Sequence, residues 1–270
     1  MGHRRSENVI ARRFVDGGEI DGGRRPEDVI VEEPLEIRLD GVTVATTMRT
    51  PGHDFELAAG WCFSEGLLGD AQIESCRYCA TGSAVDTEFN VVSVDSGGRA
   101  PEPSPRLSTA TSSCGICGST QIEQLTERLA PLPAYEPWSV AAMLSVIDHV
   151  RSQQELFDRT GGVHAAAAFD RNGVPLLVRE DIGRHNAVDK VIGSLLLESK
   201  LPARDHAIFV SGRASFDIVQ KAWAAGFEAM IAVSAPSALA VETASVAGMT
   251  LVGFVRDGAC NLYCGPGLSE

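Results

Sequence analysis

The second half of the chain alternates short apolar runs with amphipathic segments, and this alternation restricts the fold more than any other feature. Apolar runs at 163–169 and 174–178 flank Asp170-Arg171-Asn172-Gly173, a turn sequence that favours a β-hairpin. The pattern then predicts strands at 207–210, 227–233 and 249–255, and helices at 184–198, 215–225 and 237–247. Strands separated by helices require right-handed crossovers and a sheet that is covered on both faces. We therefore expect a C-terminal α/β domain with a mixed, largely parallel sheet in three layers.

The first half has a different pattern. Leu35, Ile37 and Leu39 alternate with polar residues before Asp40-Gly41, which predicts a hairpin, and a helix is expected from about 54 to 66. Further short strands are expected at 73–79 and 88–94, and helices at 120–129 and 139–157. We predict a flexible tail at 1–25, a smaller α+β domain at 26–135 that includes a mobile cysteine-bearing loop at 95–118, and the C-terminal α/β domain at 136–265.

The composition narrows the class of protein. A 270-residue chain that is 44% hydrophobic is able to bury a large core. Its net charge of -13 argues against broad binding to nucleic acid or to anionic membranes, because both need a basic face. No apolar run approaches the roughly 20 residues that span a bilayer, and the first residues lack the apolar centre of a signal peptide. We expect a cytoplasmic protein.

Two of the seven cysteines lie in the motif that is most typical of a reactive thiol pair, Ser113-Cys114-Gly115-Ile116-Cys117-Gly118. Thr120 and Glu123 follow with the spacing of a capping box, and a helix start favours the thiolate, which is the nucleophilic form of cysteine. The glycines leave both sulfur atoms uncovered by neighbouring side chains. A stretch rich in Ser, Gly and Pro at 95–106 precedes the motif, so we expect an exposed, reactive pair on a loop.

Other roles for the cysteines remain open at this point. Cys76 and Cys79 together with Cys114 and Cys117 could form a four-thiolate zinc site, although the 34 residues between the pairs exceed the common spacing of about 15 to 20. A dithiol redox centre is the other alternative, although such a motif usually lies between a strand and a helix of its own sheet. Cys260 and Cys264 are interpreted as incidental thiols.

Glycine, serine and arginine gather where the predicted strands of the C-terminal domain end. These residue types at strand-to-helix turns are typical of sites for phosphate-bearing ligands. The turns are at 180–185, 211–213, 234–237 and 256–258. His164 lies in a sequence similar to the zinc-deaminase signature, but Ala166 replaces the glutamate of that signature and no cysteine lies between Cys117 and Cys260, so deamination is excluded.

Five motifs taken together resemble the FdhD/NarQ family, the formate dehydrogenase accessory sulfurtransferases. The motifs are the cysteine motif at 113–118, Thr160-Gly161-Gly162-Val163-His164-Ala165-Ala166, Glu180-Asp181-Ile182-Gly183-Arg184-His185-Asn186-Ala187-Val188-Asp189-Lys190, Ser211-Gly212-Arg213-Ala214-Ser215 and Ser234-Ala235-Pro236-Ser237-Ala238-Leu239-Ala240. The resemblance extends from about Val31 to Tyr263, and the run at 180–190 is its most specific part.

The resemblance implies a sulfur carrier. Such a protein accepts sulfur from a cysteine desulfurase, holds it as a persulfide, and passes it to the molybdenum cofactor before that cofactor enters formate dehydrogenase. By position, Cys114 is the persulfide carrier and Cys117 its neighbour. The resemblance further implies a homodimer and a C-terminal fold similar to that of cytidine deaminases.

The resemblance also implies that the guanine dinucleotide form of the molybdenum cofactor is bound as a substrate. The residues implied or chosen as its ligands are Phe254, Val255, Arg256, Asp257, Gly258, Ala259, Arg213, His164 and His185. Arg184 and Lys221 are further candidates to neutralise phosphates, or else solvated residues on helix faces. We expect no resident metal. The alternatives are a cofactor-binding chaperone that transfers no sulfur, and a redox or zinc protein that uses its paired cysteines.

Overall fold

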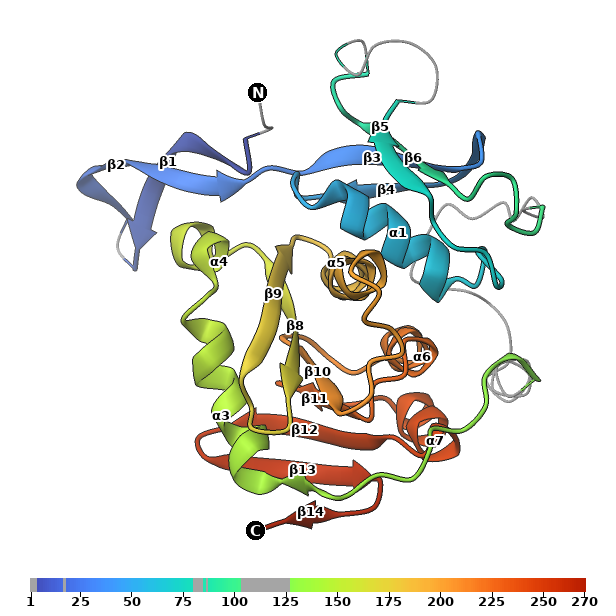
Figure 1. Cartoon of the computed structure of the whole chain (residues 1–270). Helices are drawn as coiled ribbons and strands as arrows, with labels where there is room; N and C mark the ends of the chain where they lie inside the picture. Colours follow the sequence, from blue (N-terminus) through green and yellow to red (C-terminus); the bar gives the residue numbers. More distant parts are fainter. Residues whose placement is uncertain (1–3, 17, 80–84, 86, 103–126) are drawn as a thin grey trace.

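The computed structural model describes residues 4–16, 18–79, 85, 87–102 and 127–270 of the chain. These residues form a six-stranded sheet and a four-stranded sheet, with helices packed around and between them (Figure 1). A short parallel ladder joins β7 (Trp138–Ser139) to β14 (Leu268–Ser269) near the C-terminus. Within the described ranges, no helix is both long and apolar enough to cross a bilayer.

The six-stranded sheet belongs to the second half of the chain. In spatial order its strands are β13 (Ala259–Cys264), β12 (Thr250–Arg256), β11 (Ala229–Ala232), β10 (His206–Val210), β8 (His164–Asp170) and β9 (Pro175–Asp181). Strands β9, β10, β11 and β12 run in one direction, whereas β8 and β13 run in the other. The predicted mixed sheet and the hairpin at 170–173 are confirmed. The sheet is not largely parallel, because three of its five strand pairs are antiparallel, and β13 is a strand that the sequence pattern did not predict.

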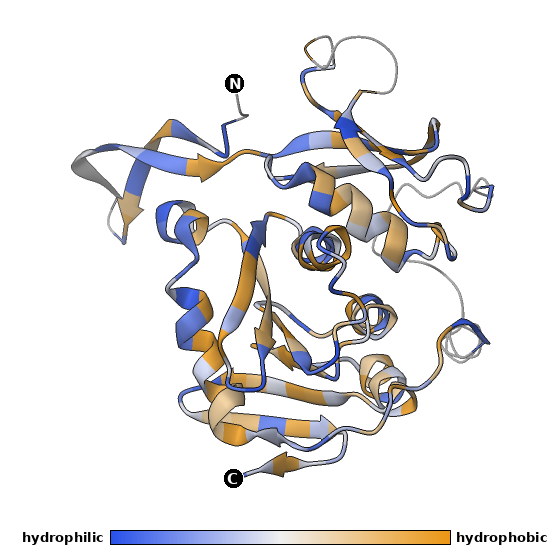
Figure 2. Ribbon diagram, in the orientation of Figure 1, coloured by the Kyte–Doolittle hydropathy of each residue, from blue (hydrophilic) through white to orange (hydrophobic). Residues whose placement is uncertain are grey.

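Helices cover both faces of this sheet. They are α5 (Arg184–Leu197), α6 (Phe216–Ala224) and α7 (Ala238–Ala247) on one face, and α3 (Val140–Arg151) on the other. Successive residues of β8 point to opposite faces: Ala166 and Ala168 pack with the first group of helices, and Ala165 and Ala167 pack with α3. Figure 2 accordingly shows mostly hydrophobic residues along β12 and a hydrophilic end on β9. The sheet is therefore buried on both faces, as its apolar runs predicted.

The four-stranded sheet belongs to the first half of the chain. Its strands, in spatial order, are β4 (Val42–Arg49), β3 (Glu33–Leu39), β6 (Val91–Asp95) and β5 (Ser75–Tyr78). Helix α1 (Asp54–Ser64) packs on it, and the buried side chains of Leu35, Ile37 and Leu57 form the shared core. The predicted hairpin at Asp40-Gly41 and the predicted helix are confirmed. The helix expected at 120–129 falls largely outside the described residues.

The first thirty residues differ from the sequence prediction. Strands β1 (Ser6–Val15) and β2 (Gly18–Ile30) form an antiparallel hairpin where we expected a tail with little regular structure. Residues of β1 are exposed or half-buried along the whole strand, so neither face gives the alternation that identifies a half-buried strand. The hairpin contacts the body of the protein at α4 (Glu155–Thr160), where Arg159 pairs with Asp28.

The single helix expected at 139–157 is in fact two helices, α3 and α4. Helix α3 ends at Arg151, and α4 begins at Glu155 with no cap from the Gln154 side chain. The buried carboxylate of Glu180 supplies the cap instead, since it accepts hydrogen bonds from the backbone N–H groups of Leu156 and Phe157 at 2.9 and 2.8 Å. A cap that comes from a distant strand leaves no local sequence signal.

This remote cap leads to a first prediction. Replacing Glu180 with Gln removes the charge and one acceptor oxygen, so one buried backbone N–H loses its partner. We expect the free energy of unfolding to fall by about 1–2 kcal/mol, measured by urea denaturation. The matched control is Glu155→Gln, because Glu155 is exposed on the same helix. Equal losses for the two variants would contradict the assigned role of Glu180.

Helices α1 and α5 pack with their backbones in direct contact at two glycines, Gly60 and Gly193. A Cβ atom added at Gly60 would lie 1.9 Å from the carbonyl oxygen of Asp189. A Cβ atom added at Gly193 would lie 1.8 Å from the carbonyl oxygen of Glu56. Because both obstacles are backbone atoms, no side-chain rotation makes room for a larger residue at either position. The proposed division into domains at 26–135 and 136–265 stays a prediction, but these glycines join the two parts closely.

Lys190 of α5 strengthens the same junction. Its Nζ atom lies 2.7 Å from Asp181 Oδ2 and donates a hydrogen bond to the carbonyl oxygen of Thr50 at 2.9 Å. The side chains of Lys190 and Asp181 have no exposed surface. Asp181 Oδ2 also accepts from the Thr50 N–H, so this buried pair ties the residue after β4 to the end of β9 and to the middle of α5.

Lys221 of α6 holds a second junction. Its Nζ atom lies 3.0 Å from both carboxylate oxygens of Asp189 and donates to Ser64 Oγ at 2.8 Å, and it pairs with Glu65 at 3.1 Å. Burial opposes the charge of Lys221, but the two carboxylates outweigh it and keep the pKa of the ammonium above its ordinary value. Lys221 therefore connects α6 to α5 and to the end of α1.

Candidate functional site

Cys114 and Cys117 lie in segment 103–126, outside the described residues, so their predicted reactivity stays a prediction. The described residues on either side of that segment both contact the turn that follows α1. Pro101 lies against Gly69, where an added Cβ would meet its Cγ at 3.0 Å, and the guanidinium of Arg128 lies against Gly66. The described residues Pro101 and Arg128, on either side of the cysteine-bearing segment, thus lie beside the same end of α1.

The described candidate residues gather at one edge of the six-stranded sheet, which we call the carboxyl edge. His164 begins β8, and His185 follows the end of β9 in the first turn of α5. Arg213 follows the end of β10, and residues 254–259 span the end of β12 and the beginning of β13. Since β9, β10 and β12 run in one direction and β8 in the other, the topology brings these segments to the same edge (Figure 1).

His164 is held by Ser211 at this edge. Its Nδ1 atom lies 3.2 Å from Ser211 Oγ, which also accepts a hydrogen bond from the backbone N–H of Ala165 at 2.9 Å. Partial burial and the nearby Arg184 cation lower the pKa of His164 below its ordinary value. His164 is therefore a neutral, oriented imidazole near neutral pH.

Arg184 and His185 occupy the first two positions of α5. The Arg184 side chain lies against the turn after β10, where an added Cβ at Gly212 would meet its Cδ at 3.6 Å and His164 Cε1 also at 3.6 Å. Burial, reinforced by the Arg184 cation, lowers the pKa of His185 to about 4. Its Nε2 atom lies 3.8 Å from the exposed carboxylate of Asp217. His185 is thus neutral and contributes no positive charge.

Residues 254–259 form a tight turn between two strands. Phe254, with φ of 53°, donates its backbone N–H to the carbonyl oxygen of Ser234 at 3.3 Å, which fixes this segment to the end of β11. Asp257 and Gly258 both have positive φ, as a two-residue hairpin turn of type I′ requires. Arg256 is exposed and lies over the Phe254 ring, whereas the Val255 side chain is buried in the core. Only the backbone of Val255 is available to a ligand.

The structure contradicts both interpretations of Lys221 that were made from the sequence. It is neither a free phosphate ligand nor a solvated residue on a helix face, because its ammonium is buried among Asp189, Ser64 and Glu65. Nothing in the sequence pattern pairs it with Asp189. Arg213, in contrast, is exposed, and the described part of the chain offers it no ion pair.

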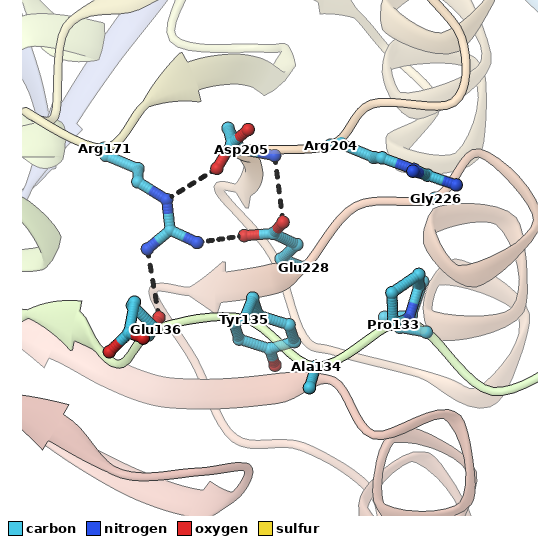
Figure 3. A pocket seen from close by; sticks show the side chains of 10 residues that line it. Pro133, Ala134, Tyr135, Glu136, Arg171, Arg204, Asp205, Gly226 and Glu228 are labelled. Carbon is cyan, nitrogen blue, oxygen red and sulfur yellow. Dashed lines mark hydrogen bonds and ion pairs between the residues drawn. The ribbon is translucent and has the colours of Figure 1, made fainter.

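The opposite edge of the sheet carries a hollow of about 440 Å³, shown in Figure 3. The guanidinium of Arg171 lies beside it and donates to Asp205 Oδ1 and to the carbonyl oxygen of Glu136, both at 3.0 Å. The same guanidinium pairs with Glu228, which also accepts from the Asp205 N–H. Arg171, Asp205 and Glu228 pair with one another. These charged groups are therefore less available to a ligand than those at the carboxyl edge.

The cysteines within the described ranges form no disulfide. Burial raises the pKa of the Cys76 thiol to about 11, and Cys79 is buried. Within the ranges that the structure describes, no group of three or more His, Cys, Asp or Glu side chains is arranged to hold a metal ion. Because Cys114 and Cys117 lie outside those ranges, the four-thiolate zinc alternative stays untested.

A model of the FdhD/NarQ family matches residues 30–268. The chain belongs to the FdhD/NarQ family. It is 48% identical over 246 residues to the sulfur carrier protein FdhD of Mycolicibacterium paratuberculosis, an alignment that covers 88% of this chain and 90% of the relative. It is 46% identical to the sulfur carrier protein FdhD of Nocardia farcinica, with 96% of this chain and 95% of the relative covered.

A solved structure from Desulfotalea psychrophila, described as a formate dehydrogenase accessory protein, has the same fold as this FdhD/NarQ chain. The TM-score is 0.76, the sequence identity is 26%, and the match covers 97% of this chain and 98% of that one. The family assignment from sequence motifs is therefore confirmed. The expected similarity of the C-terminal part to cytidine deaminases stays a prediction.

Proposed function

We propose that the protein is a sulfur carrier and sulfurtransferase that accepts sulfur from a cysteine desulfurase and passes it to the molybdenum cofactor of formate dehydrogenase. Membership of the FdhD/NarQ family and the names of the relatives support this role. The structural observation that favours it is the convergence of His164, His185, Arg213 and the turn at 254–259 on one edge of the sheet.

Cys114 is the proposed carrier. Its thiolate attacks the terminal sulfur of the donor persulfide, so that a new S–S bond forms on Cys114 while the S–S bond of the donor breaks. The donor thiolate is the leaving group, and the exchange involves no net oxidation or reduction. Such a step needs an accessible cysteine of low pKa, which the glycines and the capping-box signal around Cys114 favour.

Cys117 is the proposed resolving thiol. Its attack on the Sγ atom of the Cys114 persulfide forms a Cys114–Cys117 disulfide and releases the outer sulfur as hydrosulfide. The two electrons that reduce this sulfur come from the two cysteines, so a cellular dithiol must reduce the disulfide before the next cycle. Cys117 lies three positions after Cys114 in the sequence, a spacing that allows a disulfide between them.

The guanine dinucleotide form of the molybdenum cofactor is the proposed substrate at the carboxyl edge. Arg213 and Arg256 are exposed there and supply positive charge, although the chain as a whole carries a net charge of -13. The proposed ligands are Phe254, Val255, Arg256, Asp257, Gly258, Ala259, Arg213, His164 and His185. We further propose a cytoplasmic homodimer whose partners are the desulfurase and the dehydrogenase.

A maturation experiment distinguishes sulfur transfer from simple cofactor delivery. Formate dehydrogenase produced in cells that lack this protein is expected to contain molybdenum cofactor but to be inactive, because only the transferred sulfur is missing. The measurement is the cofactor content of the purified dehydrogenase together with its formate oxidation rate. A dehydrogenase without cofactor would instead favour a chaperone that transfers no sulfur.

A further inference from the structure

Three polar side-chain atoms at the carboxyl edge are buried and make no hydrogen bond within the described part of the chain. They are Arg184 Nε, His185 Nε2 and Ser215 Oγ. A buried donor without a partner costs about 1–3 kcal/mol, so native proteins rarely leave one without a reason. Three such atoms in neighbouring segments are therefore available to bind a ligand at this place.

The three atoms belong to the beginnings of two adjacent helices, α5 and α6 (Figure 1). Neither helix start is capped by a side chain. The N-cap residue of α5, Gly183, has no side chain, and the N-cap residue of α6, Ser215, has an extended backbone but its Oγ accepts no helix N–H. The first N–H groups of both helices thus add donors and partial positive charge to the same region.

Gly212 provides space beside these atoms. It lies in the turn between β10 and α6, and its missing side chain leaves a gap between Arg184 Cδ and His164 Cε1, each 3.6 Å from where a Cβ atom would lie. Its backbone φ is not in the left-handed region, so alanine fits here without strain and larger side chains fill the gap.

The charges in this region favour an anion over a cation. Arg184 is the nearest cation, and the exposed Arg213 comes directly after Gly212. Asp217 is the opposing charge, because its exposed carboxylate lies 3.8 Å from His185 Nε2. An anion at the starts of α5 and α6 therefore gains from one arginine, one hydroxyl and two helix starts. It is repelled by the solvated Asp217, whereas Glu65, which also acts on His185, is paired with Lys221.

We propose that Arg184, His185 and Ser215 form a diphosphate subsite between the starts of α5 and α6. The inference rests on the proposed function, which supplies a dinucleotide substrate whose diphosphate needs a binding site. Arg184 Nε and Ser215 Oγ donate to phosphate oxygens, and the neutral His185 contributes one further N–H. The turn at 254–259 is then left to contact other parts of the dinucleotide.

The test is calorimetric binding of inorganic pyrophosphate to the full-length protein. Arg184→Gln is expected to weaken binding about tenfold, since a charge-assisted hydrogen bond is lost. Ser215→Ala is expected to weaken it about fivefold, the effect of one neutral hydrogen bond. Gly212→Val is expected to abolish binding by filling the gap. Asp217→Asn is expected to tighten it about threefold, because an exposed repulsive charge is removed.

The matched control is Arg204→Gln, which removes an exposed arginine at the opposite edge of the same sheet and is expected to leave pyrophosphate affinity unchanged. Weakening that is equal for Arg184→Gln and Arg204→Gln would overturn the proposal. Looser binding by Asp217→Asn would also overturn it, and the expected tightening is an effect that loss of fold cannot mimic.

Separate measurements distinguish this proposal from the proposed function. A protein that takes up sulfur on Cys114 but binds no pyrophosphate would refute the subsite and leave the sulfur carrier intact. A protein that binds pyrophosphate through Arg184 but takes up no sulfur would refute the sulfur carrier and leave the anion subsite standing.

Discussion

Replacing Gly193 with alanine is expected to lower the free energy of unfolding by about 3 kcal/mol or more, which is a large fraction of the stability of an ordinary protein. The added Cβ would lie 1.8 Å from the carbonyl oxygen of Glu56, about half the distance of an ordinary contact. Helices α1 and α5 would have to separate. Separation would weaken the hydrogen bonds between Lys221 and Ser64 and between Lys190 and Thr50.

The loss is measured by urea denaturation, with Gly212→Ala as the matched control. A Cβ at Gly212 meets its nearest neighbours at 3.6 Å, an ordinary van der Waals distance, so this variant is expected to keep the stability of the natural protein within about 0.5 kcal/mol. A Gly193→Ala variant that is as stable as Gly212→Ala would contradict the close contact described between α1 and α5.

The elements of the C-terminal part were predictable because each has its own local signal. The turn Asp170-Arg171-Asn172-Gly173 marks a hairpin, and Gly226 and Gly248 follow the ends of two helices. Those signals depend on residues that are adjacent in the sequence. These local signals predicted the order of the elements and the sheet edge at which the candidate ligand-binding residues meet.

The interactions that join the two halves were not predictable in the same way. Lys221 and Asp189 belong to different helices, and a lysine on a helix normally indicates a solvated face. Gly60 and Gly193 also give no sign, in either helix alone, that they face each other. The exposed hairpin of β1 and β2 lacks a buried face, and the cap on α4 comes from Glu180 on a distant strand. All of these depend on tertiary packing.

The candidate site was predicted in part. His164 was a candidate because of its similarity to the zinc-deaminase signature, and His185 and Arg213 because they lie in turns after predicted strands; the fold brings all three to one edge. Ser215, a ligand in our proposal, was not a candidate from the sequence, because a serine before a helix is normally its cap. The proposal depends on its Oγ atom, which caps no helix N–H in the structure.

Replacing Cys114 with alanine is expected to abolish sulfur loading completely, because the persulfide has no other carrier in the proposed mechanism. Burial raises the pKa values of the Cys62, Cys76, Cys260 and Cys264 thiols, which keeps these cysteines in the unreactive thiol form at neutral pH. None of the four is therefore a substitute for Cys114. Cys260→Ala is the matched control, since Cys260 is only partly buried and is expected to be dispensable for loading.

The most direct test is the intact mass of the protein after incubation with a cysteine desulfurase and cysteine. The natural protein and Cys260→Ala are expected to gain the mass of one sulfur atom, which a thiol reductant removes, and Cys114→Ala is expected to gain none. A mass gain by Cys114→Ala equal to that of the natural protein, or no gain by the natural protein, would contradict the account.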